Sequence, residues 1–277
     1  MNTFLAEFAS LMWGPWILFL LLGTGCWLTI CLRGIQVRQF FYSLRLTFSK
    51  ERGGEGDISH FGALSTALAA TVGTGNIAGV SAAVALGGPG AIFWMWVTGL
   101  VGMATKYCEG FLAVKYRQVN HRGEISGGPM YYLEKGLGQK WLGVCFAFFG
   151  GMAAFGIGNM VQANTTVHAL NGSLGVSSLF VGGVMMLLTG MVIIGGIKRI
   201  AEVASYLVPF MVLVYFLGAL IVVLNNLDGL GAGIKMILED AFTGTAATGG
   251  FAGASLASTI RYGVARGLFS NESGMGS

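Results

Sequence analysis

Long apolar stretches without charge alternate with short charged segments along the chain. Residues 13–32 contain no Asp, Glu, Lys or Arg, and neither do residues 58–105. Because about 20 apolar residues suffice for one helical membrane crossing, this pattern predicts an all-α polytopic membrane protein. We predict seven spans, at residues 13–32, 60–85, 91–114, 141–169, 178–197, 203–224 and 241–260.

The second predicted span is interrupted near its middle by the polar, glycine-containing sequence Gly-Thr-Gly-Asn at residues 73–76. Two glycines weaken a helix, and unwound backbone at membrane depth is tolerated only where protein or a polar cavity surrounds it. The pattern therefore predicts a broken helix whose break lines a binding site. Close packing between helices is the alternative, because small residues in membrane helices usually mark such packing.

The seventh predicted span is a second candidate for a broken helix, since residues 241–259 contain four Gly and four Thr and little side-chain bulk. Phe251 follows two glycines there, and its ring either gates a small ligand or packs against a neighbouring helix. Thr243 is expected to be structural, because threonine in membrane helices often bonds back to its own helix. Residues 261–277 are expected to form a tail beyond this span.

Composition and the placement of charge also indicate a membrane protein. Hydrophobic residues make up 54% of the chain, charged residues only 10%, and the mean hydropathy is +0.71, whereas soluble domains carry about 25% charged residues. With the N-terminus outside, every Lys and Arg except Lys235 falls on the cytoplasmic side, as the positive-inside rule requires. We therefore predict a multi-pass protein of the plasma (inner) membrane, which contacts the lipid bilayer and binds no nucleic acid.

Lys106 and Glu109 lie three residues apart on one helix face. They are interpreted as a pair at the cytoplasmic end and not as a coupling element.

Polar side chains at membrane depth are costly and usually functional. Gln162 lies near mid-span and is favoured for the site. Asn159 and Asn164 cannot both face one site, and each either joins it or hydrogen-bonds between helices. The candidate clusters contain no ionisable residue that could relay protons, and no pairing of catalytic residues indicates an enzyme. A neutral cage of amide, hydroxyl and carbonyl oxygens suits sodium, and the amide end of a broken helix attracts a carboxylate. The clusters are Thr71, Thr74 and Asn76; Asn159, Gln162 and Asn164; and Thr243, Thr245 and Thr248.

Six segments resemble the blocks of one known family and follow the family's order. The segment at 87–102 is the most specific of them, and it resembles the signature of the alanine/glycine:cation symporters, also called the sodium:alanine symporters. The resemblance covers nearly the whole chain. The segments are ATVGTGNIAGV (70–80), GGPGAIFWMWVTGLVG (87–102), SGGPMYYL (126–133), GIGNMVQAN (156–164), TGTAATGGFAGAS (243–255) and RGLFSNESGMGS (266–277).

This resemblance implies a LeuT-like fold, in which two inverted five-helix repeats surround a site near the membrane midplane. Residues 13–32 would form an extra N-terminal span, residues 60–224 the first repeat, and residues 241–277 the start of the second repeat. The family continues past the position of Ser277 with four further spans. The resemblance therefore implies that the chain is a fragment or a truncated product whose C-terminal half is missing.

The function implied by the resemblance is sodium-coupled symport of a small neutral amino acid, alanine or glycine, into the cell by alternating access. Na⁺ is then the coupling ion, and no other cofactor is expected. The alternative is a truncated, non-transporting membrane scaffold or partner subunit. By analogy with the prototype of the fold, the substrate would be bound by Thr74, Gly75, Asn76, Gln162, Thr248, Gly249 and Phe251. Sodium would be held by Ala69, Thr71, Val72 and Asn76.

Overall fold

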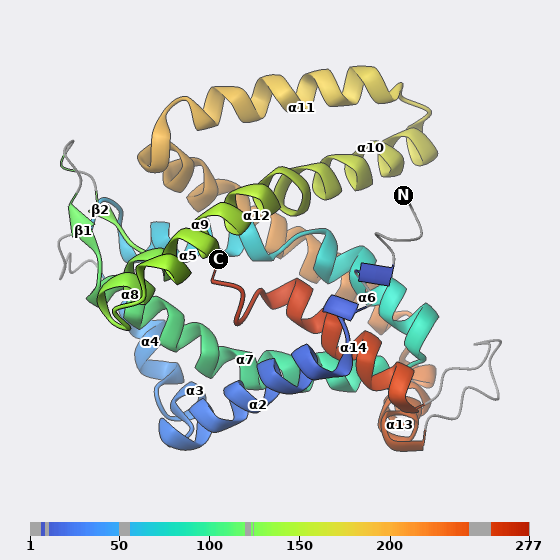
Figure 1. Ribbon diagram of the computed structural model, residues 1–277. Coiled ribbons are helices and arrows are strands. Elements are labelled where there is room, and N and C mark those ends of the chain that lie inside the picture. Colours follow the sequence, from blue (N-terminus) through green and yellow to red (C-terminus); the bar gives the residue numbers. More distant parts are fainter. Residues whose placement is uncertain are drawn as a thin grey trace. The chain divides into compact units, whose positions relative to one another are not determined.

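The computed structural model describes residues 7–8, 11–49, 56–119, 123, 125–243 and 256–276, and most of these residues lie in helices (Figure 1). The chain forms two compact units. The first unit comprises residues 1–40, 75–109 and 217–277, and the second comprises residues 41–74 and 110–216.

The first unit is a packed group of helices taken from both ends of the chain and from residues 75–109. It contains α2 (Pro15–Cys31), α3 (Ile35–Arg38), α6 (Thr74–Gly87) apart from its first residue, most of α7 (Gly90–Lys115), α13 (Leu227–Thr243) and α14 (Leu256–Asn271).

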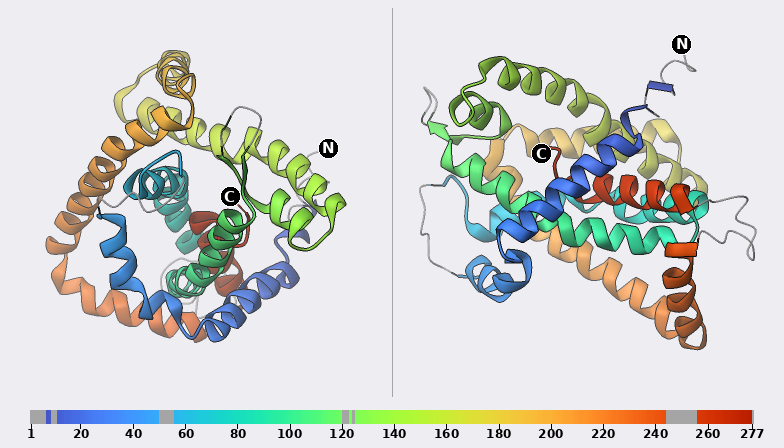
Figure 2. Two further views of the ribbon diagram at one scale, coloured as in Figure 1. Left: turned by 90° about the vertical axis from the view of Figure 1, so that its left-hand side faces the viewer. Right: turned by 60° about the horizontal axis from the view of Figure 1, so that its bottom comes forward.

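Helices α2, α7 and α14 lie side by side within this unit (Figures 1 and 2). Their contacts are made by small residues, because Gly25 of α2 meets Val101 of α7 and Gly267 of α14 meets Thr98 of α7. Small residues let two helix backbones approach closely, which is the usual way in which membrane helices associate. Apolar side chains fill the joint between α2 and α14: Leu18, Val264 and Leu268.

The second unit holds the middle of the chain. It contains α4 (Phe40–Thr47), α5 (His60–Thr71), α8 (Pro129–Lys135), α9 (Lys140–Phe155), a short π-helix (Gly156–Met160), α10 (Val161–Leu174), α11 (Ser178–Ile193) and most of α12 (Gly196–Leu224). A two-residue antiparallel ladder joins β1 (Gln118–Val119) to β2 (Ile125–Ser126).

Local sequence explains where several helices begin and end. Pro15 and Pro129 occupy the first turns of α2 and α8, where the missing N–H of proline is not needed. Ser59 caps α5 by accepting from the N–H of Gly62, and Ser177 caps α11 in the same way. Helix α10 ends at Leu174 and is followed by Gly175, whose φ of 66° is the left-handed conformation that glycine favours.

Three helical stretches in the described part of the chain are long and apolar enough to cross a membrane: residues 60–87, 140–174 and 196–224. Helices α2 and α11 are shorter but also apolar. Large apolar side chains of α11 and α12 are exposed, including Leu179 (90%) and Ile194 (89%). Such faces are unfavourable in water and suit a lipid environment. The count of seven crossings remains a prediction.

The helices extend further than the hydropathy pattern predicts in three places. Helix α10 continues to Leu174, α12 already includes Lys198 and Arg199, and α14 runs through residues predicted as a tail. Helix α14 contains Arg261 and Arg266, so a count of apolar residues misses it. It is helical because small residues on one face, among them Gly263 and Gly267, are buried against α7.

Candidate functional site

The helix break predicted in residues 73–76 is present, although it is shorter than the polar sequence that indicated it. Helix α5 ends at Thr71 and α6 begins at Thr74, so that only Val72 and Gly73 lie between them. Val72 has extended backbone (φ −88°, ψ 98°), and its N–H still donates to the carbonyl of Leu68 at 2.8 Å. The break therefore falls at Val72–Gly73, and Asn76 lies in the first turn of α6.

The two helix ends at this break carry opposite partial charges. The last four carbonyls of a helix and its first four N–H groups have no partner inside that helix. Ala69 and Thr71 lie in the last turn of α5, where the partial charge is negative, and Thr74 and Asn76 lie in the first turn of α6, where it is positive. Helix α5 itself is held within the second unit, because Gly62 lies against Ala201 of α12. The break thus offers carbonyls for a cation and N–H groups for an anion.

Gln162 approaches this break from a distant part of the sequence. Its Oε1 accepts a hydrogen bond from the N–H of Thr74 at 3.1 Å, within the second unit. The side-chain amide also lies against Gly73, where an added Cβ would stand 2.9 Å from Nε2 of Gln162. Glycine at position 73 is therefore what lets Gln162 reach the Thr74 N–H.

The three polar residues Asn159, Gln162 and Asn164 do not behave alike. Asn159 and Asn164 are exposed, and Asn159 Oδ1 accepts from the N–H of its own neighbour Met160 at 2.6 Å. Of these three residues, Gln162 is the one that the structure places against the break. The sequence favoured Gln162 because of its depth, but the side chain's bond to Thr74 depends on the packing of α10.

The π-helix just before α10 was not predicted from the sequence. It spans Gly156–Met160 and shifts the helical hydrogen bonds by one residue, immediately ahead of Gln162. Single π turns inside helices occur frequently at functional sites. Its two glycines, Gly156 and Gly158, are a signal for an irregular helix, although they do not specify the π form.

Two polar oxygens at the start of α6 are buried without a hydrogen-bond partner. They are Oγ1 of Thr74 and Oδ1 of Asn76. By contrast, the hydroxyl of Thr71 is paired, because it donates to the carbonyl of Ala67 at 3.0 Å. Unpaired buried acceptors are uncommon and costly. Hydroxyl and amide oxygens are neutral oxygen donors of the kind that a hard cation such as sodium prefers.

Gly75, predicted to bind substrate, lies against α14 within the first unit. An added Cβ at Gly75 would stand 3.2 Å from Cα of Ser270 and 3.3 Å from Cδ1 of Phe269. Glycine here lets α6 approach α14 closely. The structure therefore gives Gly75 a packing role whether or not its N–H meets a ligand.

The predicted residues of the seventh span fall mostly outside the described residues. Thr245, Thr248, Gly249 and Phe251 belong to the segment 244–255, and their roles stay predictions. Thr243 is described, and its Oγ1 donates to the carbonyl of Glu239 at 2.7 Å. That bond is the structural role predicted for Thr243.

Asp240 is a buried link between α13 and α7. Its side chain is 5% exposed, and Oδ2 accepts from the N–H of Gly90 at 2.8 Å. Gly88 has a φ of 78°, and an added Cβ there would stand 2.6 Å from the same oxygen. Trp94 Nε1 donates to the carbonyl of Ala241 at 3.0 Å. Residues 88, 90 and 94 therefore contact the end of α13, the helix that precedes the segment 244–255.

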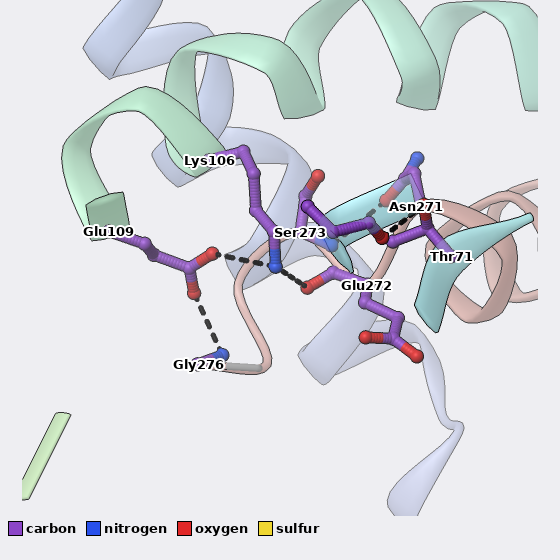
Figure 3. A network of polar contacts seen from close by, with 8 residues as sticks. Thr71, Lys106, Glu109, Asn271, Glu272, Ser273 and Gly276 are labelled. Carbon is purple, nitrogen blue, oxygen red and sulfur yellow. Dashed lines mark hydrogen bonds and ion pairs between the residues drawn. The ribbon is translucent and has the colours of Figure 1, made fainter. Parts of the chain in front are cut away.

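The pair Lys106–Glu109 holds the turn that follows α14 (Figure 3). Lys106 Nζ lies 3.6 Å from Glu109 Oε2 and donates to the carbonyl of Glu272 at 3.3 Å. Glu109 Oε1 accepts from the N–H of Gly276 at 2.8 Å. The structure thus gives this pair a role in tertiary packing that its spacing on the helix did not reveal.

Comparison with known proteins assigns the family. The model of the sodium:alanine symporter family matches residues 1–277. The sodium/alanine symporter AgcS of Methanococcus maripaludis is 53% identical over 274 residues, which cover 97% of this chain and 60% of that protein. An uncharacterized transporter of Haemophilus influenzae is 49% identical over 277 residues, covering 100% of this chain and 61% of the relative. The amino-acid carrier protein AlsT of Bacillus subtilis is 40% identical over 262 residues, covering 95% and 55%.

These relatives are transporters and not enzymes, and the apolar helices described above are those of a multi-pass membrane protein. The chain spans between 55% and 61% of the length of the three relatives. The match to the family model extends over the whole chain. The chain therefore belongs to the sodium:alanine symporter family.

Proposed function

We propose that this protein takes up a small neutral amino acid, alanine or glycine, together with Na⁺. The observation that carries the proposal is the break between α5 and α6, where buried oxygens of Thr74 and Asn76 have no partner. The family and the name of its relative AgcS support sodium and alanine as the transported pair.

The roles of the binding residues follow from the chemistry of the two helix ends. The amino-acid carboxylate binds the N–H groups at the start of α6, at Thr74, Gly75 and Asn76, where the helix dipole favours an anion. Gln162 lies beside this position. Thr248, Gly249 and Phe251 complete the pocket in the proposed site.

Sodium is proposed to bind the carbonyls near the end of α5 together with the Asn76 side chain. The set is Ala69, Thr71, Val72 and Asn76, and it offers only neutral oxygens. A cation held by neutral donors gains from a nearby carboxylate, because the substrate supplies the negative charge that the protein lacks. This charge pairing is the physical reason why sodium and the amino acid would bind together.

Transport is proposed to follow alternating access in a LeuT-like fold, with residues 13–32 as an extra span and residues 60–224 as the first repeat. The N-terminus is proposed to face the outside of the plasma membrane, because all Lys and Arg except Lys235 then lie inside.

Uptake by the full-length protein in liposomes tests the proposal. Radiolabelled alanine uptake driven by an inward Na⁺ gradient is expected for the wild type, and K⁺ in place of Na⁺ is expected to abolish it. Asn76→Ala is expected to raise the Na⁺ concentration for half-maximal uptake at least about tenfold, since a buried ligand to a charge contributes about 1.5–3 kcal/mol. Asn226→Ala is the matched control, because Asn226 is exposed and its side-chain amide donates to the carbonyl of Val222 in its own helix. Sodium-independent uptake, or an unchanged sodium dependence in Asn76→Ala, would refute the proposed site.

A further inference from the structure

The hydrogen bond between Gln162 and Thr74 occupies a group that the proposed function assigns to the substrate. Thr74 is the first residue of α6, and its N–H has no partner inside the helix. Gln162 Oε1 accepts from this N–H at 3.1 Å, across 88 residues of sequence. The side-chain carbonyl therefore fills the position that an oxygen of an amino-acid carboxylate would take.

The geometry around the bond shows that Gln162 is seated closely. An added Cβ at Gly73 would stand 2.9 Å from Nε2, 3.0 Å from Oε1 and 3.3 Å from Cδ of Gln162. The whole amide plane thus lies on the bare backbone of Gly73. A substrate carboxylate cannot bind the same N–H until this amide moves.

We propose that Gln162 is a built-in occupant of the carboxylate position, which satisfies the Thr74 N–H when the site is empty and is displaced when substrate binds. This inference rests on the proposed function, since it concerns the carboxylate end of the same site. Gln162 satisfies a partly buried donor, and leaving that donor without a partner would be costly. Its neutral carbonyl is a weaker acceptor than a carboxylate, because charge-assisted hydrogen bonds are about twice as strong. The substrate carboxylate therefore displaces the Gln162 amide. The affinity for the substrate is lowered, because the hydrogen bond between Gln162 and Thr74 must be broken first.

The inference and the simpler role of Gln162 as a substrate ligand predict opposite effects of the same substitutions. If Gln162 competes with the substrate, Gln162→Leu removes the competitor and strengthens alanine binding. If Gln162 is a ligand, for example an acceptor for the substrate ammonium, the same change weakens binding. Gln162→Glu also separates the two roles, because a carboxylate competes more strongly for the Thr74 N–H but would attract an ammonium.

Equilibrium binding of alanine to the full-length protein in lipid nanodiscs, at saturating NaCl, measures these effects. Gln162→Leu is expected to lower the Kd about fivefold, the factor that corresponds to one net hydrogen bond. Gln162→Glu, which keeps the shape of the side chain, is expected to raise the Kd at least about tenfold. Asn164→Leu is the matched control, since it replaces an exposed amide two residues further along α10, and its Kd is expected to stay within about twofold of the wild type.

The outcomes distinguish failure of the inference from failure of the proposed function. If the wild type shows no sodium-dependent alanine binding, the proposed function fails and the inference fails with it. If the wild type binds alanine but Gln162→Leu weakens binding or leaves it unchanged, the inference alone is overturned. It is also overturned if Gln162→Glu tightens binding, or if Asn164→Leu lowers the Kd as much as Gln162→Leu. Should Gln162→Leu fail to fold, Gln162→Glu decides the question by the direction of its change.

Discussion

Replacing Asp240 by alanine removes the acceptor of a buried hydrogen bond between two helices that lie 150 residues apart in sequence. The Gly90 N–H at the start of α7 then loses its partner, and a buried donor left unsatisfied costs about 1–3 kcal/mol. The favourable interaction of the carboxylate with the N-terminal end of α7 is also lost, which adds about 0.3–1 kcal/mol. We expect Asp240→Ala to destabilise the protein by about 2–3 kcal/mol.

Thermal unfolding of the detergent-solubilised protein measures this loss. At about 2–4 °C per kcal/mol for a protein of this size, the Tm is expected to fall by about 5–10 °C. Asp240→Asn keeps an oxygen acceptor and is expected to lose less than half as much. Asp228→Ala is the control, because Asp228 is exposed in the first turn of α13 and makes only a helix-end interaction. A Tm for Asp240→Ala no lower than that of Asp228→Ala would refute the assignment of Asp240 as the link between α13 and α7.

Two further changes test the packing around the site. Gly88→Ala is expected to lower the Tm by at least about 5 °C, because the φ of 78° disfavours a side chain and the added Cβ would stand 2.6 Å from Asp240 Oδ2. Gly99→Ala is the control, because a Cβ added there meets nothing within 4 Å. Equal Tm shifts in the two variants would contradict this reasoning. Lys106→Met is expected to lower the Tm because it leaves Glu109, whose side chain is 16% exposed, without its ion-pair partner, and adding Glu109→Gln is expected to restore part of the loss. Lys235→Met is the control, since it breaks an exposed ion pair and is expected to change the Tm by less than about 2 °C. If the double variant with Lys106→Met and Glu109→Gln is no more stable than Lys106→Met alone, the pairing of Lys106 with Glu109 is contradicted.

Part of the site was predictable because its signal is local in sequence. The glycines and polar residues at 73–76 weaken a helix wherever they occur in an apolar span, so the break could be predicted without knowing what surrounds it. The bond of Thr243 to its own helix was predictable for the same reason, since both groups belong to consecutive turns. The family could also be identified, because its blocks are contiguous sequence segments.

Other features depend on contacts between distant segments and carry no such signal. Gly90 lies 150 residues from Asp240, and Glu272 lies 166 residues from Lys106. Neither the buried link to Gly90 nor the bond to the Glu272 carbonyl therefore follows from local periodicity. Helix α14 was not predicted from hydropathy, because its arginines lower the mean hydropathy of the segment. The packing role of its small residues is visible only in their contacts with α7.

The sequence by itself therefore determined the membrane-protein class, the family and the approximate position of the helix break, because these depend on composition and on short contiguous patterns. The tertiary structure decided which of Asn159, Gln162 and Asn164 reaches the break, since that choice depends on the phase of one helix after a π turn. It also decided that the Thr74 N–H is already bonded, because a hydrogen bond between residues 88 positions apart exists only once the helices have packed.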